Sequence, residues 1–164
     1  MQLSVHLGIA SFTAIASASL PPINLGHAIL LRTNLFVAWS PFTPTTTQDL
    51  YDFCGPATST RTWNAIRAVS TGYATGPVCR NPFNITDVDT GITYHDLELA
   101  CVDDNLPWAY TPQVTAVVDR ATNKAVETCV PASFADGSFL ETFCDRGEGG
   151  LSILLGYDFA CKSV

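Results

Sequence analysis

All six cysteines of this 164-residue chain follow an N-terminal segment that looks like a cleavable secretion signal. The apolar stretch at residues 5–16 leads into Ala16-Ser17-Ala18, a small-x-small pattern typical of a cleavage site. We therefore predict a signal peptide at residues 1–18 and one mature domain at residues 19–164. In an oxidising space outside the cell, an even number of cysteines predicts a framework of disulfides. The six are Cys54, Cys79, Cys101, Cys129, Cys144 and Cys161.

Three turn signals divide the second half of the chain into pairs of strands. They lie at residues 87–91, 120–124 and 145–150, and each contains residues that tolerate a positive φ or cap a turn through their side chains. Residues 151–161 place apolar side chains at every second position, which is typical of a strand with one buried face, and Gly156 indicates a bulge or bend. We therefore predict a mainly β fold, an antiparallel β-barrel or β-sandwich built from successive hairpins.

The first half of the chain is less regular. Residues 29–39 also alternate, so we predict a strand there. Two prolines and a run of threonines over residues 40–47 predict a loop. Residues 59–70 fit either a short helix capped by Ser59 or a strand, and we favour the helix.

Six cysteines allow fifteen pairings, and the predicted hairpins reduce that number. A turn centred near Asp89 puts Cys101 opposite residue 77, and Cys79 lies within two positions of that site. We therefore predict a Cys79–Cys101 bridge across this hairpin. Zinc sites need closely spaced cysteines such as C-x2-C, and the chain has none, so we expect no metal site.

The last hairpin guides the remaining two pairs. Its turn places Cys144 beside residue 151, which is about 33 Å along the strand from Cys161, so these two cannot bond. Cys161 should run back towards the connector that starts beside Cys129. We predict Cys129–Cys161, which leaves Cys54–Cys144.

Charge narrows the range of partners. The chain has 15 acidic and 8 basic residues, a net charge of −7 at pH 7. Nucleic acids and anionic membranes both need concentrated positive charge, so we expect neither as the main partner. The apolar run of the leader is also too short and too interrupted for a membrane span, which needs about 20 residues.

Few residues could carry catalysis, because only His27 and His95 remain after the leader is removed. On a regular strand, Tyr94, Asp96 and Glu98 share one face, and His95 lies on the other face with the leucines that follow it. His95 with Glu98 or Asp96 could act as general acid and base, as in a secreted ribonuclease or glycosidase. The solvated face of a hairpin is the simpler interpretation. We therefore assign no catalytic residue, expect no cofactor and favour a protein that is not an enzyme.

Two features favour recognition at the surface. Asn84 begins the only N-x-[ST] sequon and is a candidate glycosylation site. Trp108 and Tyr110 lie between two prolines, which predicts a rigid loop that could expose both aromatic rings for binding. Insertion of these rings into the core is an equally good interpretation.

Residues 144–150 read CDRGEGG, and residues 157–161 read YDFAC. These two segments are similar to the tail of a fungal allergen and elicitor family. In that family a cysteine and a glycine-rich turn precede an Asp-Phe-x-Cys element, with shorter spacing than here. The resemblance implies an antiparallel β-barrel, and it carries no established set of catalytic residues.

The leader, the acidic balance and the six cysteines together resemble the small secreted cysteine-rich proteins of filamentous fungi. Many of those proteins are effectors or elicitors that meet a plant host. The resemblance implies a secreted, extracellular binding protein that acts on a host extracellular protein or a cell-wall glycan. The alternative function is a secreted hydrolase that uses His95 with Glu98 or Asp96.

Overall fold

The computed structural model describes residues 20–30, 33–55, 67–70, 78–103, 112–145 and 152–164. Within these ranges no helix is both long and apolar enough to cross a membrane. The described residues form nine strands and one helix: β1 (Asn24–Leu30), β2 (Thr33–Trp39), α1 (Thr47–Cys54), β3 (Arg67–Ser70), β4 (Phe83–Thr86), β5 (Thr93–Cys101), β6 (Val114–Asp119), β7 (Lys124–Pro131), β8 (Glu141–Asp145) and β9 (Ser152–Ser163).

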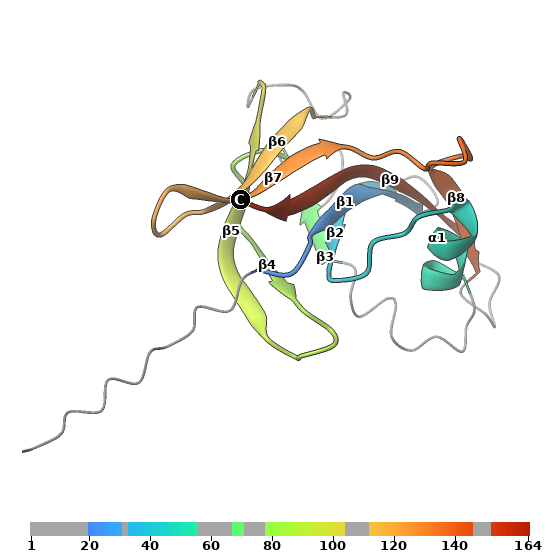
Figure 1. Ribbon diagram of the computed structural model, residues 1–164, viewed down its shortest axis with the longest axis horizontal. Helices are drawn as coiled ribbons and strands as arrows, with labels where there is room; N and C mark the ends of the chain where they lie inside the picture. Colours follow the sequence, from blue (N-terminus) through green and yellow to red (C-terminus); the bar gives the residue numbers. More distant parts are fainter. Residues whose placement is uncertain (1–19, 31–32, 56–66, 71–77, 104–111, 146–151) are drawn as a thin grey trace, which may run out of the picture.

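The strands form one antiparallel sheet that curls into a nearly closed barrel (Figure 1). The strand order is β3-β2-β1-β9-β7-β6-β5-β4, and β8 pairs with β9. The long strand β9 organises the sheet, because β1 lines one of its edges while β7 and β8 share the other. The barrel closes where β2 and β3 approach β4. The predicted antiparallel barrel of hairpins is therefore confirmed.

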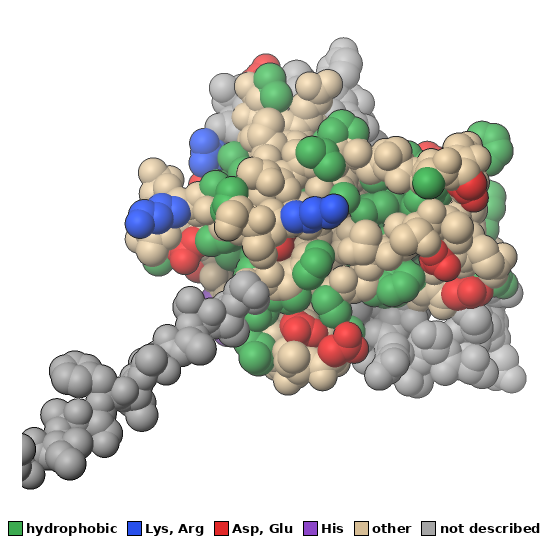
Figure 2. Space-filling view, in the orientation of Figure 1, with side chains coloured by type: hydrophobic (Ala, Val, Ile, Leu, Met, Phe, Trp, Pro, Cys, Tyr) green, Lys and Arg blue, Asp and Glu red, His purple; other side chains and the backbone are tan. Residues whose placement is uncertain are grey.

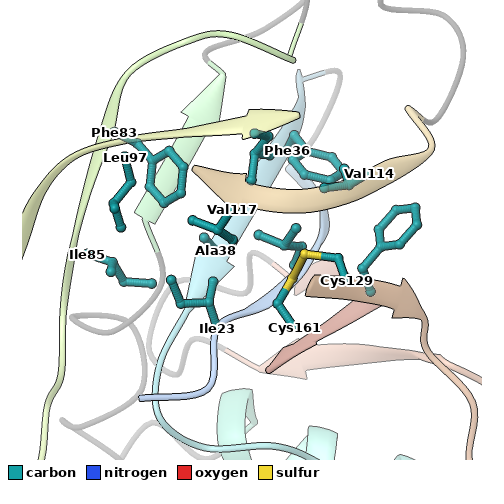
Figure 3. Close-up of a cluster of buried hydrophobic side chains, with 13 residues drawn as sticks. Ile23, Phe36, Ala38, Phe83, Ile85, Leu97, Val114, Val117, Cys129 and Cys161 are labelled. Carbon is teal, nitrogen blue, oxygen red and sulfur yellow. A yellow bond between two sulfur atoms is a disulfide. The ribbon is translucent and has the colours of Figure 1, made fainter. Parts of the chain in front are cut away.

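Two apolar clusters lie on opposite faces of the part of the sheet formed by β1, β2 and β9. Burying one such side chain contributes roughly 1.5–3 kcal/mol, so these clusters supply most of the stability. Figure 3 shows the first cluster, the barrel core, which surrounds the Cys129–Cys161 bridge and includes Ile23, Phe36, Ile85, Val117 and Phe159. The second cluster, the helix core, lies between the sheet and α1 and includes Ala28, Trp39, Leu50, Leu155 and Tyr157.

The three hairpins predicted in the second half are confirmed as β4–β5, β6–β7 and β8–β9. The strand predicted over residues 151–161 is also confirmed, but the prediction that the same face is buried along its whole length is wrong. A bulge leaves Asp158 without a partner in β1, because Leu25 pairs with Phe159 and Gly26 pairs with Tyr157. An extra residue reverses the alternation, so Tyr157 faces the helix core while Phe159 faces the barrel core.

Two predictions for the first half are wrong. The single strand over residues 29–39 is a hairpin, in which β1 and β2 pair from Asn24↔Trp39 to Leu30↔Thr33. Residues 67–70, predicted as the end of a helix, form β3, and residues 59–66 lie outside the described ranges.

The one described helix begins inside the stretch that was predicted as a loop. Thr46 caps α1, accepting a hydrogen bond from the Asp49 backbone N–H, while the Asp49 carboxylate accepts one from the Thr46 backbone N–H. This reciprocal capping box satisfies N–H groups that every helix start leaves without a partner. The T-x-x-D spacing at residues 46–49 was the signal for this helix in the sequence.

The three predicted disulfides are confirmed. Cys79–Cys101 joins the segment before β4 to the end of β5, and Cys129–Cys161 joins directly paired positions of β7 and β9. Cys54–Cys144 ties the last residue of α1 to β8. Cys144 pairs with Ile153 in the β8–β9 ladder, which keeps it far from Cys161 along β9.

Candidate functional site

A β-bulge changes where the predicted catalytic residues lie. Phe83 pairs with Leu97 and Ile85 pairs with Tyr94, so β5 has two residues opposite the single residue Asn84. The two are His95 and Asp96, and both are exposed, with Asp96 at φ 56°. The expectation that His95 shares the face of Leu97 is therefore wrong, because Leu97 is buried. Tyr94 packs against the barrel core instead of lying beside Asp96.

Two arginines form ion pairs with the carboxylates that were candidates for acid–base chemistry. Arg120 Nη1 lies 2.5 Å from Asp96 Oδ1, and Arg120 Nε lies 3.3 Å from Glu98 Oε2. Arg80 Nη1 lies 2.8 Å from Glu98 Oε1. Within the described part of the chain, His95 is bonded to neither carboxylate. The arrangement is an ion-pair network on the outside of the barrel, in which both Glu98 oxygens and one Asp96 oxygen contact arginine.

The candidate glycosylation site lies on the same outer surface. Asn84 is exposed in β4, and its Oδ1 accepts a hydrogen bond from the backbone N–H of Asp96 at 3.0 Å. Its Nδ2, the atom to which a glycan is attached, points to no partner among the described residues. Trp108 and Tyr110, the predicted binding aromatics, lie outside the described residues.

A second group of titratable side chains escaped the sequence reasoning. His27 of β1 lies between Asp158 of β9 and Glu141 of β8. Its Nδ1 is 3.1 and 3.0 Å from the two Asp158 oxygens, and its Nε2 is 3.4 Å from Glu141 Oε1. The pKa of His27 is raised above its usual value, mainly by the hydrogen bond with Asp158. Burial opposes this shift, and the charges of Asp158 and Glu141 add to it. We call these three residues the His27 cluster.

A glycine makes room for this imidazole. The ring of His27 lies directly against Gly156, where a Cβ would come within 2.1 Å of His27 Cε1. Gly156 pairs with His27 on one side and with Glu141 on the other. Glycine inside a long strand indicates a close approach of another group, and that was the only sequence signal of the cluster.

Protonated His27 should bind three strands together, and this predicts a pH-dependent contribution to stability. A histidine whose folded pKa is raised contributes fully below its unfolded pKa, and the contribution is lost as pH rises through the folded pKa. We expect His27→Gln to lower the free energy of unfolding by about 1–2 kcal/mol at pH 5.5 and by clearly less at pH 8.5. Urea unfolding at the two pH values measures this. The exposed His95→Gln is the control, and an equal loss for His27→Gln at both pH values contradicts the prediction.

An open cavity of about 440 Å³ lies at one end of the barrel, beside the Cys129–Cys161 bridge. The backbone N–H of Val102 donates to the carbonyl of Gln113 at 3.0 Å and holds the rim between β5 and β6. Concave apolar surface with a few polar groups is typical of a binding site. The lining includes the apolar Val102, Val114, Pro131 and Phe159 and the polar Gln113 and Thr115.

Compared with known proteins, the chain matches no family model, and no curated protein and no solved structure is significantly similar to it. The function is therefore inferred from the chemistry of the cavity, the ion-pair network and the His27 cluster.

Proposed function

We propose that the protein is a secreted, non-enzymatic binding protein of the effector or elicitor type, which holds an apolar side chain of a host extracellular protein in the cavity at the end of the barrel. The cavity carries this proposal, because its volume of about 440 Å³ accommodates a large aromatic or aliphatic group and its walls are mainly apolar. Three disulfides fit a protein that works in an oxidising space.

The lining favours a protein partner over a cell-wall glycan. A sugar carries many hydroxyl groups, each of which needs a hydrogen-bond partner when it is buried. Among the residues that line the cavity, the polar side chains are Gln113 and Thr115, too few for a buried sugar ring. Binding through an inserted apolar anchor matches the way in which interfaces gather their energy into a few buried side chains.

The hydrolase alternative receives less support. Its carboxylates, Asp96 and Glu98, are bonded to Arg120 and Arg80, and His95 stands apart from both. A glycan on Asn84 is compatible with binding, because Asn84 bonds to Asp96, six positions along the chain from Val102 at the cavity rim.

A charge at the rim of the cavity should abolish partner capture. Val102 is 71 % exposed, so Val102→Glu places a carboxylate at the mouth without disturbing the core. We expect the immobilised wild type to capture at least tenfold more partner from plant apoplastic fluid than immobilised Val102→Glu, measured by quantitative mass spectrometry. The paired change Trp108→Ala and Tyr110→Ala tests whether those aromatics belong to the same surface.

Ile92→Glu is the matched control, because Ile92 is also exposed and lies at the opposite end of β5. It should capture the partner as the wild type does. Capture that survives Val102→Glu overturns the proposal. Selective binding to a glycan array that Val102→Glu abolishes assigns the cavity to a glycan instead.

A further inference from the structure

We propose that the outer edge of β8 binds an extended cationic segment of a partner protein as an added β-strand. This surface is separate from the cavity, which lies beside β7, whereas β8 pairs with the other half of β9. Strand addition of this kind combines main-chain hydrogen bonds with pockets for alternate side chains. The backbone, the side chains and the charge of β8 all favour such a partner.

The hydrogen-bonding pattern leaves the outer edge of β8 open. The carbonyl of Leu140 accepts from the N–H of Tyr157 at 2.8 Å, so Leu140 faces β9. Main-chain groups alternate in direction along an antiparallel strand, so Thr142 also faces β9 while Glu141 and Phe143 face outward. Among the described residues, nothing bonds to these outward N–H and C=O groups. An open edge of this kind is a template for another strand.

The side chains along this edge alternate between aromatic and acidic. Phe139, Glu141 and Phe143 occupy every second position, and they are 86 %, 54 % and 66 % exposed, the value for Glu141 referring to its side chain. Proteins protect open edges with lysine, proline or an inward-pointing charge, and two exposed phenylalanines do the opposite. A partner strand that carries an apolar, a basic and an apolar residue at every second position would cover both rings and place a cation against Glu141.

The charge of this region favours a cation. Glu141 and Asp158 share the single imidazole of His27, so the His27 cluster stays negative even when His27 is protonated. Figure 2 shows acidic side chains over the end of the molecule that carries α1 and β8, and the Lys and Arg side chains visible in that view lie away from it. Complementary charge raises the association rate and selects against acidic partners.

The edge is also held rigid before any partner arrives. Cys54–Cys144 joins β8 to α1, and the hydroxyl of Thr47 donates to the carbonyl of Phe139 where the edge begins. A preorganised strand loses little conformational entropy on binding, so a short added segment is sufficient.

Three synthetic heptapeptides test the proposal: TVTKTVT, which carries Val, Lys and Val on one face, TVTETVT and a scrambled form of the first. We expect the wild type to bind TVTKTVT at least tenfold more tightly than TVTETVT or the scrambled peptide, measured by fluorescence anisotropy. Amide shifts in NMR spectra should be largest for Glu141 and Phe143. Glu141→Lys should reverse the preference in favour of TVTETVT, a result that a loss of folding cannot produce.

Phe143→Ser should weaken binding of TVTKTVT at least fivefold, while Val130→Ser, which alters an exposed apolar residue of β7, should leave it unchanged. Val102→Glu should also bind the peptide normally, which separates this proposal from the cavity. Equal binding of the three peptides, or binding of none at millimolar concentration, overturns the proposal. A wild-type dimer that light scattering detects and Glu141→Lys abolishes assigns the edge to a second copy of the chain and also overturns it.

Discussion

Replacing Glu127 with glutamine should remove most of the pH dependence of the protein's stability between pH 4.5 and pH 8. Glu127 lies on the inner side of β7 and is fully buried. Its Oε2 accepts a hydrogen bond from the backbone N–H of Ile23 at 3.2 Å, and its Oε1 has no partner among the described residues. Burial of a carboxyl group disfavours its charged form, and here it raises the pKa of Glu127 to about 8.

The direction of the effect follows from proton binding. Between pH 4.5 and 8 the folded chain keeps a proton on Glu127 that the unfolded chain has lost, so stability falls as pH rises through this range. At 1.36 kcal/mol per pKa unit, the cost at pH 8 is on the order of 4 kcal/mol. Glutamine has the shape of the protonated acid and cannot ionise, so Glu127→Gln should match the wild type near pH 4.5 and exceed it by about 3 kcal/mol at pH 8.

Urea unfolding from pH 4 to 9 measures both profiles. Asp89→Asn, which alters an exposed carboxylate in the β4–β5 turn, should leave the change of the free energy of unfolding with pH as it is in the wild type. If the free energy of unfolding of Glu127→Gln changed with pH as that of the wild type does, Glu127 would be ionised in the folded protein. His27 changes stability in the same direction, so the fold as a whole should be most stable in mild acid.

Alanine at Gly26 should destabilise the fold severely, and alanine at Gly156 should destabilise it in a way that a second change can partly repair. A Cβ at Gly26 would lie 1.9 Å from the carbonyl oxygen of Gly156, so β1 and β9 would have to separate. The three atoms nearest to a Cβ at Gly156 would all belong to the imidazole of His27. We expect losses of more than about 3 kcal/mol for Gly26→Ala and about 2–3 kcal/mol for Gly156→Ala.

The two clashes differ in which atoms must move, and His27→Ala separates them. In the Gly156→Ala background, His27→Ala removes the clashing ring and should cost less than it costs the wild type, a coupling of about 1 kcal/mol or more. In the Gly26→Ala background it should restore nothing, because the obstacle is a carbonyl group of the main chain. Thermal unfolding of the single and double variants measures the coupling. Additive losses in the Gly156→Ala pair would mean that the ring does not occupy this place.

The hairpins and disulfides were predictable because local signals determine them. Turn residues and period-two alternation locate β4–β5, β6–β7 and β8–β9, and the hairpin registers then restrict which cysteines can meet. The N-terminal hairpin was not predictable in the same way, because the alternation of residues 29–39 continues without a break from the end of β1 into β2. A strand that folds back on itself and one that runs straight through show the same pattern of side chains.

The candidate sites were harder to predict because bulges and long-range contacts create them. One extra residue at His95–Asp96 separates a histidine from the leucines whose face it was expected to share. A second bulge, at Asp158, accompanies the His27 cluster, in which His27 and Asp158 lie 131 residues apart in the sequence. Neither bulge changes the composition of its strand, so periodicity alone places the residues on the wrong side.

The arrangement of the disulfides determines what a single proteolytic cut would do to the protein. The loop closed by Cys54–Cys144 overlaps the loop closed by Cys129–Cys161, and together they span every peptide bond from residue 54 to residue 161. A single cut anywhere in that interval, in an exposed turn or in any of the long connections, therefore leaves two fragments that are still covalently joined. One cleaved peptide bond in this interval therefore does not release a fragment of the barrel.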